Sequence, residues 1–584
     1  DPDSGRVVGY QQTGDGSGSA RVVGRVEKRT ARVELRLESA VREGSYPLEG
    51  AEDLAHGQFV AARLASGKAT VEEVLGEAPT AGLRIAAVID EFQLPTQFSE
   101  EVLAAAEAIQ GPRDWLPRED LRRKPFVTID GVDAKDFDDA VLAEKRGGGF
   151  KLYVAIADVS AHVSAGDALD RSARERGTSV YFPGRVLPML PHRLADDLCS
   201  LRPHVDRAVL VCEMDLRPDG SFKSVRFYPA LICSQARLIY EDVSQALSSG
   251  DFSEDWNRDV RRNLRNLAQL HKALDASRAL RGALDFDSRE LQVQLDEEGQ
   301  VVGMRVPERT LAHRLIEECM ILANVAAAKA LRKAKQPFLA RIHEAPDQRK
   351  LEALREYLGG LGLSLGGGES PGPGDYAKLL LSTRQHAQAD SIQLAVLQSL
   401  QQAVYAPSDA GHFGLALEDY AHFTSPIRRY PDLLVHRALY SMLGAPIQAS
   451  EDWDSLGGQC SALERRADKA GWAVIEALKC DFLRDKVGSV MGGVITGVTE
   501  FGLFIELREV GVSGLAHISQ LGNDYFVLES QNRRLRGQRT GQMFKLGQSI
   551  DVRIAAVDAA ARKLDLIPVA TEPSPETAPR SRRR

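Results

Sequence analysis

The chain has 584 residues, of which 43% are hydrophobic and 27% are charged, and its formal net charge is −8. These proportions are ordinary for globular proteins, and the length predicts about three or four domains rather than one core. No run of about 18 apolar residues and no signal peptide is visible, which argues against a membrane protein. The negative charge does not favour a nucleic-acid partner, but it does not exclude one, because local basic stripes suffice for binding.

The six cysteines are widely separated along the chain and form no C-x-x-C pair. They therefore predict neither a zinc ribbon nor a redox motif. Several lie in apolar sequence, such as Cys233 and Cys319. We expect buried, reduced thiols and a cytoplasmic location.

Residues 1–18 are rich in glycine, serine and aspartate, which indicates a linker or arm. In residues 19–80, short alternating runs predict the strands of a small OB-type barrel. This unit has few aromatic residues on which bases could stack. It is therefore either a purely structural barrel or one that holds an RNA backbone through basic side chains. The candidates are Arg21, Arg25, Lys28, Arg29 and Arg32.

Residues 81–486 begin with a connector, in which Ser99 predicts the start of a helix that ends near Ile109. Strands follow, with a hairpin around residues 147–149, and the later part is helical. The clearest helix is expected over residues 309–335, where apolar positions recur at helical spacing. Residues 359–374 are rich in glycine and proline and predict a surface excursion.

Four aspartates lie within ten residues of the chain. Asp130, Asp136, Asp138 and Asp139 follow a D-x5-D-x-D-D pattern, and Asp133 is a fifth acid among them. The apolar run at residues 126–129 predicts a buried strand that ends at Asp130. Carboxylates this crowded repel one another. Hard divalent cations remove that repulsion, and Mg²⁺ suits carboxylates combined with substrate phosphates.

Two other interpretations of this segment are weaker. A solvated acidic loop is disfavoured, because the apolar Phe137 lies inside the cluster and apolar strands flank it. A calcium-binding EF-hand loop is excluded by spacing. Counted from Asp130, its third position is Val132 and its sixth is Lys135, where the motif needs an acid and a glycine.

Residues 125–140 resemble the catalytic signature of the ribonuclease II/ribonuclease R family, and further blocks of likeness follow over most of the chain. These blocks are residues 154–160, 177–183, 187–191, 198–203, 312–320, 411–417 and 423–432. The last two favour the ribonuclease R branch. The resemblance implies a multidomain α+β protein, with an N-terminal cold-shock-like OB barrel, a large α/β RNB catalytic domain and a C-terminal S1 OB barrel. Members of this family usually carry two cold-shock domains, whereas only one fits here.

Residues 487–568 predict a second β module, which resembles an S1 RNA-binding OB domain through residues 493–507 and 514–519. This resemblance assigns base stacking to Phe501, Phe504 and His517, with Tyr525 nearby. For Phe504 the alternative is a place in the barrel core. Residues 569–584 are proline-rich and basic, which predicts a disordered tail.

The resemblance also assigns roles within the acidic segment. Asp130, Asp136, Asp138 and Asp139 match metal-ligating acids, and Asp138 matches the acid most closely tied to the chemical step. The ion would be Mg²⁺ or Mn²⁺, present as one or two ions. Two ions about 3.5–4 Å apart can activate a water and neutralise the leaving oxygen of a phosphodiester.

Arg428 matches the family's phosphate-gripping arginine, and its neighbour Arg429 could share that role. For both, the alternative is a salt bridge to Asp432.

Two further pairs of residues match positions that contact the RNA. Tyr181 and Phe286 match an aromatic clamp on the last nucleotides. Tyr240 and Glu318 match residues that favour ribose over deoxyribose, and a carboxylate can accept a hydrogen bond from a 2′-OH. Glu317 is adjacent to Glu318 in the predicted helix and should point about 100° away.

The resemblance therefore implies a processive, magnesium-dependent 3′→5′ exoribonuclease that releases nucleoside 5′-monophosphates. Its substrates would be single-stranded RNA and duplex RNA with a 3′ overhang, and it would act as a monomer. The alternatives are a catalytically silent RNA-binding or adaptor protein on the same scaffold, and an endonuclease or DNase.

Overall fold

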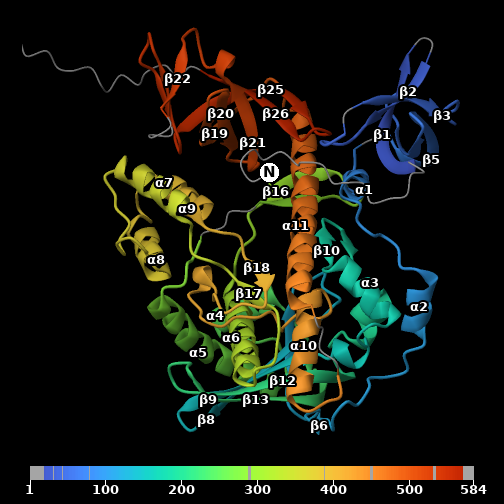
Figure 1. Ribbon diagram of the computed structural model, residues 1–584, viewed down its shortest axis with the longest axis vertical. Coiled ribbons are helices and arrows are strands. Elements are labelled where there is room, and N and C mark those ends of the chain that lie inside the picture. The colour runs from blue at the N-terminus through green and yellow to red at the C-terminus, as the bar shows by residue number, and fades with distance from the viewer. Residues whose placement is uncertain are drawn as a thin grey trace, which may run out of the picture.

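The computed structural model describes residues 19–569, apart from 30–31, 43, 78, 287–290, 387, 448–451 and 530–533. The expected arm at 1–18 and nearly all of the expected tail at 569–584 lie outside these residues. In the part that is described, no helix has both the length and the apolar character needed to cross a membrane. Two β-barrels lie at one end of the molecule, and the large central domain forms the other (Figure 1).

The N-terminal barrel is closed and has the strand order β1-β2-β3-β5-β4. Its strands are β1 Ser19–Arg29, β2 Arg32–Leu37, β3 Ser45–Glu49, β4 Phe59–Ala65 and β5 Lys68–Gly76. Val26, Leu35 and Val60 are fully buried inside it. The predicted five-stranded barrel is confirmed, although β3 gave no sequence pattern because Leu48 is its only buried residue.

Two helices connect this barrel to the central domain. They are α1 Ala81–Phe92 and α2 Glu100–Glu107. The Ser99 side chain accepts a hydrogen bond from the Val102 amide, so the predicted helix start is confirmed. The helix ends at Glu107, two residues before the expected Ile109.

The central domain is built on a seven-stranded sheet with the order β14-β7-β8-β9-β12-β13-β6. The strands are β6 Glu119–Asp120, β7 Val127–Asp130, β8 Asp139–Arg146, β9 Gly149–Ala157, β12 Asp206–Leu216, β13 Phe222–Cys233 and β14 Ala236–Ile239. Most neighbours are antiparallel, but β14 runs parallel to β7 and β6 runs parallel to β13. The predicted strand into Asp130 and the hairpin at residues 147–149 are both confirmed.

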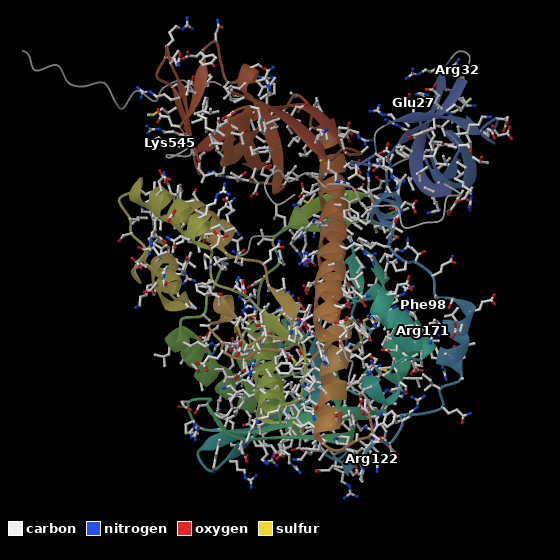
Figure 2. All side chains as sticks on the ribbon, in the orientation of Figure 1. Glu27, Arg32, Phe98, Arg122, Arg171 and Lys545 are labelled. Atoms are coloured by element: carbon white, nitrogen blue, oxygen red, sulfur yellow. The ribbon has the colours of Figure 1, made fainter. Side chains whose placement is uncertain are left out.

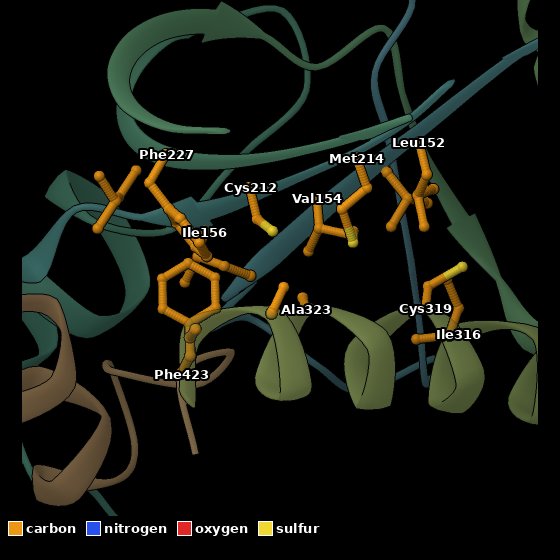
Figure 3. Close-up of a cluster of buried hydrophobic side chains, with 14 of the residues drawn as sticks. Leu152, Val154, Ile156, Cys212, Met214, Phe227, Ile316, Cys319, Ala323 and Phe423 are labelled. Carbon is orange, nitrogen blue, oxygen red and sulfur yellow. The ribbon is translucent and has the colours of Figure 1, made fainter. Parts of the chain in front are cut away.

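Helices cover this sheet. They include α3 Ala168–Arg176, α4 Tyr240–Ser249, α5 Arg258–Arg281, α6 Leu311–Lys333 and α10 Tyr430–Met442. The long helix α11 Trp453–Arg484 instead runs from this domain to α1 and the second barrel (Figure 1). The predicted helix at 309–335 is α6. Ile316, Cys319 and Ala323 of α6 pack against the apolar face of β9 and β12, as Figure 3 shows. All six cysteines are free and five are buried, as expected for reduced thiols, but Cys233, which was also expected to be buried, is only half-buried.

Helices α7 Gln348–Gly359, α8 Pro373–Ser382 and α9 Ala389–Ser399 form a separate apolar cluster. The mostly exposed excursion predicted at residues 359–374 joins α7 to α8. Short hairpins and turns complete the domain. They are β10 Val180–Phe182 with β11 Arg185–Leu187, β15 Gln292–Leu295 with β16 Val301–Arg305, β17 Ala340–Ile342 with β18 Val404–Ala406, the 3₁₀ turns Val159–Ala161 and Phe413–Leu415, and a π-helical turn Arg193–Leu198.

The C-terminal barrel is also closed, with the order β19-β20-β21-β26-β25, and a three-stranded sheet β22-β23-β24 is attached to it. Its strands are β19 Val490–Thr499, β20 Gly502–Leu507, β21 Val512–His517, β22 Phe526–Glu529, β23 Arg534–Gly537, β24 Met543–Lys545, β25 Ser549–Asp558 and β26 Lys563–Pro568, with a 3₁₀ turn Ile518–Gln520. The second predicted β module is confirmed.

Helix α1 ties both barrels to the central domain through buried ion pairs. The side chain of Arg84 is only 2% exposed and donates to Asp481 of α11 at 2.7 and 2.8 Å and to Glu38 of the first barrel at 2.6 Å. Glu91, about two turns further along α1, accepts a hydrogen bond from Arg562 of the second barrel at 2.5 Å. One helix therefore fixes the placement of three bodies.

Replacing Arg84 by methionine should destabilise the protein, because it leaves Glu38 and Asp481 buried without their cation. We expect the free energy of unfolding to fall by about 3–5 kcal/mol, measured on the first transition in urea. The matched control is Arg63→Met, since Arg63 pairs with Glu72 at the surface. A similar loss in both variants would contradict the central role of Arg84.

Candidate active site

The four aspartates of the D-x5-D-x-D-D pattern lie at one end of the central sheet. Asp130 ends β7 and Asp139 begins β8, and the two strands are antiparallel neighbours. The chain between them therefore returns to the point where it left the sheet. Asp133, Asp136 and Asp138 lie on the segment that connects the two strands. Asp133 is exposed, Asp136 is half-buried and Asp138 is buried.

The electrostatics of these acids follow from burial and crowding. Burial raises the pKa of Asp130, and the nearby Asp139 and Asp136 raise it further. Burial also raises the pKa of Asp139 and of Asp138, and Arg428 opposes both shifts. One carboxylate oxygen of Asp130, Oδ2, is buried and has no hydrogen-bond partner. Buried carboxylates in this state are stabilised by a cation placed among them.

These residues fit a divalent cation by chemistry, since carboxylate oxygens are its preferred ligands and Asp130 Oδ2 lacks a partner. In the described part of the chain, however, no three acid, histidine or cysteine side chains are close enough to form a ligand set as they stand. The aspartate side chains would have to turn toward an arriving ion. The backbone that carries them is already in place.

A second segment, residues 425–429, closes over Asp138. The Ile427 amide donates to Asp138 Oδ1 at 2.9 Å, and Arg428 Nε lies 3.7 Å from Asp138 Oδ2. The Arg428 side chain is 41% exposed and also donates to Ser425 Oγ. Its guanidinium therefore lies beside the acids while remaining accessible to a ligand.

The two neighbouring arginines have different environments. Arg429 faces inward and donates to Asp432 Oδ1 at 2.8 Å, and Asp432 itself is fully buried. The same Asp432 oxygen accepts from the Ser425 amide at 2.8 Å. The salt bridge to Asp432, which the sequence left open for both arginines, is made by Arg429. Of these two arginines, only Arg428 contacts the acidic cluster.

Tyr181 brings the predicted aromatic clamp to the same place. It lies on β10, is 47% exposed, and donates its hydroxyl to Asp136 Oδ2 at 2.9 Å. Burial of the hydroxyl and the charge of Asp136 raise the pKa of Tyr181. The strand is also bonded to the arginine segment, because Ser179 N and Thr178 Oγ1 donate to the Arg428 carbonyl at 2.9 and 3.0 Å.

Phe286, the other clamp residue, is half-buried against the cluster formed by α7, α8 and α9. The structure thus joins Tyr181 to the acids by a hydrogen bond, whereas Phe286 belongs to a neighbouring packing unit. A shared grip on one ligand by these two rings stays a prediction.

Of the two residues predicted to sense ribose, Tyr240 lies near the acids, whereas Glu318 lies on α6 and pairs with arginine. Tyr240 begins α4 and stacks on His313 with ring centroids 3.9 Å apart. Burial raises the pKa of Tyr240, with added contributions from Asp139 and Asp130. Glu318 is buried and accepts from Arg278 at 2.7 Å, whereas Glu317 is half-exposed and pairs with Arg309. As expected from helical geometry, only one of the two glutamates faces inward.

The C-terminal barrel presents its predicted aromatic side chains at the surface. Phe501 and Phe504 are 49% and 36% exposed and meet edge to face at 5.9 Å, and Tyr525 is 72% exposed. His517 is exposed and lies 2.8 Å from Ser519 Oγ. The alternative that placed Phe504 in the barrel core is wrong.

The basic residues expected in the N-terminal barrel are largely paired within the protein. Arg21 binds Glu73 and Asp90, Arg25 approaches Glu38, and Arg29 binds Glu27. Lys28 donates to the Glu52 carbonyl and Arg32 is exposed (Figure 2). These contacts favour the structural alternative for this barrel.

Known protein families match the central domain and the C-terminal barrel separately. A family model described as the RNB domain matches residues 118–445, which is more than half of the chain. The chain belongs to the RNB family. A second model, the S1 RNA binding domain, matches residues 484–567, so both modules expected from the resemblance are confirmed.

Several curated relatives carry the name Ribonuclease R. The protein of Escherichia coli (strain K12) is 42% identical over 533 residues, which cover 88% of this chain but only 65% of that protein. The protein of Thermotoga maritima is 39% identical over 517 residues, or 86% of this chain and 72% of that protein. The chain thus spans just under two thirds of the length of the first of these relatives.

Solved structures agree in fold. The chain is similar to Mycoplasma genitalium RNase R, with a TM-score of 0.87 and 26% identity over 94% of this chain and 90% of that chain. It is also similar to yeast Ssd1, a pseudonuclease, with a TM-score of 0.65 and 19% identity over 88% of this chain and 67% of that chain. The second likeness concerns the fold alone.

Three residues of the site were not found from the sequence. Thr178 and Ser200 lie in blocks that were noticed, but their hydroxyl contacts depend on which segments meet in space. Arg237 lies outside every block and gave no signal. Its position beside the acids depends on the parallel pairing of β14 with β7.

Arg428 and Arg429 should respond differently to the same replacement. Arg429→Met leaves the buried Asp432 without its cation, so we expect the free energy of unfolding to fall by about 3–5 kcal/mol. Arg428→Met removes a half-exposed side chain and should change it little. Thermal and urea unfolding of both purified variants measure this difference. Equal effects would contradict the division between the two arginines.

Proposed function

We propose that the chain is a processive 3′→5′ exoribonuclease that hydrolyses RNA to nucleoside 5′-monophosphates with the help of Mg²⁺ or Mn²⁺. One observation carries the proposal. Four aspartates lie at one end of the central sheet, and an exposed tyrosine and an exposed arginine from two distant segments contact Asp136 and Asp138 among them. The relatives named Ribonuclease R support the same activity.

When bound, one or two divalent ions supply an activated water and a Lewis acid at the scissile phosphate. Asp130, Asp136, Asp138 and Asp139 would hold them. Arg428 would bind the phosphate, and its accessible guanidinium beside Asp138 supports this role. A planar guanidinium stabilises the charge that grows on the phosphoryl oxygens in the transition state.

Tyr181 would hold a nucleotide at the end of the RNA beside the acids. Its ring is exposed while its hydroxyl is fixed on Asp136, so a base stacked on the ring would lie next to the acids. Stacking is tolerant of sequence, which suits an enzyme that advances along any RNA. Tyr240 and Glu318 would contact the 2′-OH and so favour RNA over DNA.

The S1 barrel would hold the incoming strand. Phe501, Phe504 and Tyr525 form an exposed aromatic surface on which unpaired bases can stack, and His517 lies at the end of β21. The Mycoplasma genitalium structure was determined with a ribose-methylated single-stranded RNA, which supports a single strand as the substrate here. Duplex RNA with a 3′ overhang is proposed as a further substrate.

The alternative of a silent RNA-binding protein is disfavoured by the site itself. The likeness to a pseudonuclease means that this fold alone does not decide between the two activities. The acids at all four positions and Arg428 are present here. We also propose a monomer, and a cytoplasmic location on the ground of the six free cysteines.

The test is digestion of three 5′-labelled RNAs with Mg²⁺ and excess protein: a single strand, a duplex with a single-stranded 3′ extension, and its blunt twin. We expect stepwise shortening of the first two from the 3′ end and resistance of the blunt duplex, which has no strand to thread. Internal cuts would indicate an endonuclease. Binding without shortening would favour the silent alternative.

Asp138→Asn should abolish turnover and spare RNA binding. The substitution keeps the shape of the side chain but removes a charge from the cluster, so the hydrolysis rate should fall by orders of magnitude. RNA affinity, measured without metal by fluorescence anisotropy, should remain and should depend on salt. The matched control is Asp133→Asn, since Asp133 is exposed. Nearly normal hydrolysis by Asp138→Asn would remove Asp138 from the mechanism.

A further inference from the structure

The backbone between Asp130 and Asp136 must be fixed if the two carboxylates are to meet the same ion. We call residues 131–136 the acid loop. It lies outside the strands and has one internal turn bond, from Ala134 N to the Gly131 carbonyl at 3.2 Å. Most of its residues are exposed. A loop of this kind is held mainly by the side chains that reach it from elsewhere.

Arg237 holds the beginning of the acid loop. It lies on β14, opposite Thr128 of the parallel strand β7, which leads directly into Asp130. Its Nη2 donates to the carbonyls of Gly131 and Val132 at 2.7 and 2.6 Å. The guanidinium also lies 5.8 Å from the centre of the Phe137 ring.

Ser200 holds the end of the same loop. Its hydroxyl is fully buried, donates to the Lys135 carbonyl at 2.6 Å and accepts from the Phe137 amide at 3.1 Å. The two bonds lie on either side of Asp136. The acid loop is therefore fixed at both ends, by a neutral hydroxyl at one and a cation at the other.

The positive charge of Arg237 lies where it should oppose the binding of a cation. It is close enough to Asp130 to favour the ionised carboxylate. A fixed positive charge beside a cation site also repels the cation. By electrostatics alone, Arg237 should therefore weaken metal binding. Its two carbonyl bonds supply the opposite effect, because they keep Asp130 and Asp136 at a fixed separation.

We infer that Arg237 is a positioning residue, which fixes the acid loop by its carbonyls so that Asp130 and Asp136 can receive one divalent ion. The inference deepens the proposed function and rests on it for the identity of the metal site. Outer contacts of this kind commonly change metal affinity by roughly 10–100-fold when they are removed.

The sign of one measurement decides between positioning and charge. Mn²⁺ binding is followed by electron paramagnetic resonance without RNA. The Asp130→Asn protein serves as the background, because Mn²⁺ that it still binds is bound at other sites. Arg237→Met should raise the half-saturating Mn²⁺ concentration by roughly tenfold or more. Arg237→Lys should recover most of the loss, since an ammonium group can donate to the same carbonyls. Unchanged or tighter binding by Arg237→Met would overturn the inference.

The control is Arg122→Met, which removes one positive charge from the opposite edge of the sheet. Arg122 lies at the end of the molecule away from the two barrels (Figure 2) and binds the surface acids Asp120 and Asp206. Its Mn²⁺ binding should equal that of the wild type. If Arg237→Met does not fold, Arg237→Gln replaces it, with weaker Mn²⁺ binding expected and tighter binding contradicting the inference.

RNA affinity without metal separates positioning from direct contact. Arg237→Met should bind single-stranded RNA as the wild type does, and a weaker affinity with a smaller salt dependence would make Arg237 an RNA ligand instead. The Mn²⁺ measurement involves no turnover. A wild-type protein that binds Mn²⁺ but does not shorten RNA would overturn the proposed function and leave the role of Arg237 standing.

Discussion

Repulsion among buried carboxylates is the constraint on which this site depends. Burial raises the pKa of Asp130, and the nearby charges of Asp139 and Asp136 raise it further, while burial also raises the pKa of Asp139. Such a cluster costs free energy in the folded chain unless positive groups face it. The surrounding structure supplies them in part, through the Ile427 amide, Arg428 and Arg237. The remaining negative charge is what a divalent cation would neutralise.

The rest of the fold keeps this arrangement rigid. Residues 177–181, 425–429 and the acid loop are far apart in sequence, yet backbone and side-chain bonds join each to the next. Behind them, α6 packs its small and apolar side chains on the sheet that carries β7 and β8 (Figure 3). At the far end, α1 fixes both barrels through Arg84 and Glu91. The exposed aromatic surface of the second barrel thus keeps a fixed relation to the acids.

Sequence reasoning found what is local and missed what depends on tertiary contact. The strand into Asp130, helix α6 and the first barrel followed from hydrophobic periodicity, the second barrel followed from its resemblance to an S1 domain, and the acid pattern was visible as spacing. The roles of Arg428 and Arg429 could not be separated, since both are three or four residues from Asp432 in sequence. Strand β3 was missed because one buried leucine gives no alternation. Arg237 was missed because only the pairing of β14 with β7 brings it to the acids.

Three arginines near the site illustrate why residue type alone does not assign a role. Arg429 donates to a buried carboxylate, so its charge is neutralised within the protein. Arg428 lies beside Asp138 but stays accessible, so its charge is available to a phosphate. Arg237 donates to two backbone carbonyls, which carry no net charge, and its own charge faces Asp130. In the proposed metal site the charge of Arg237 would oppose the cation, and we infer that its two bonds to the acid loop outweigh this effect by holding the carboxylates in place.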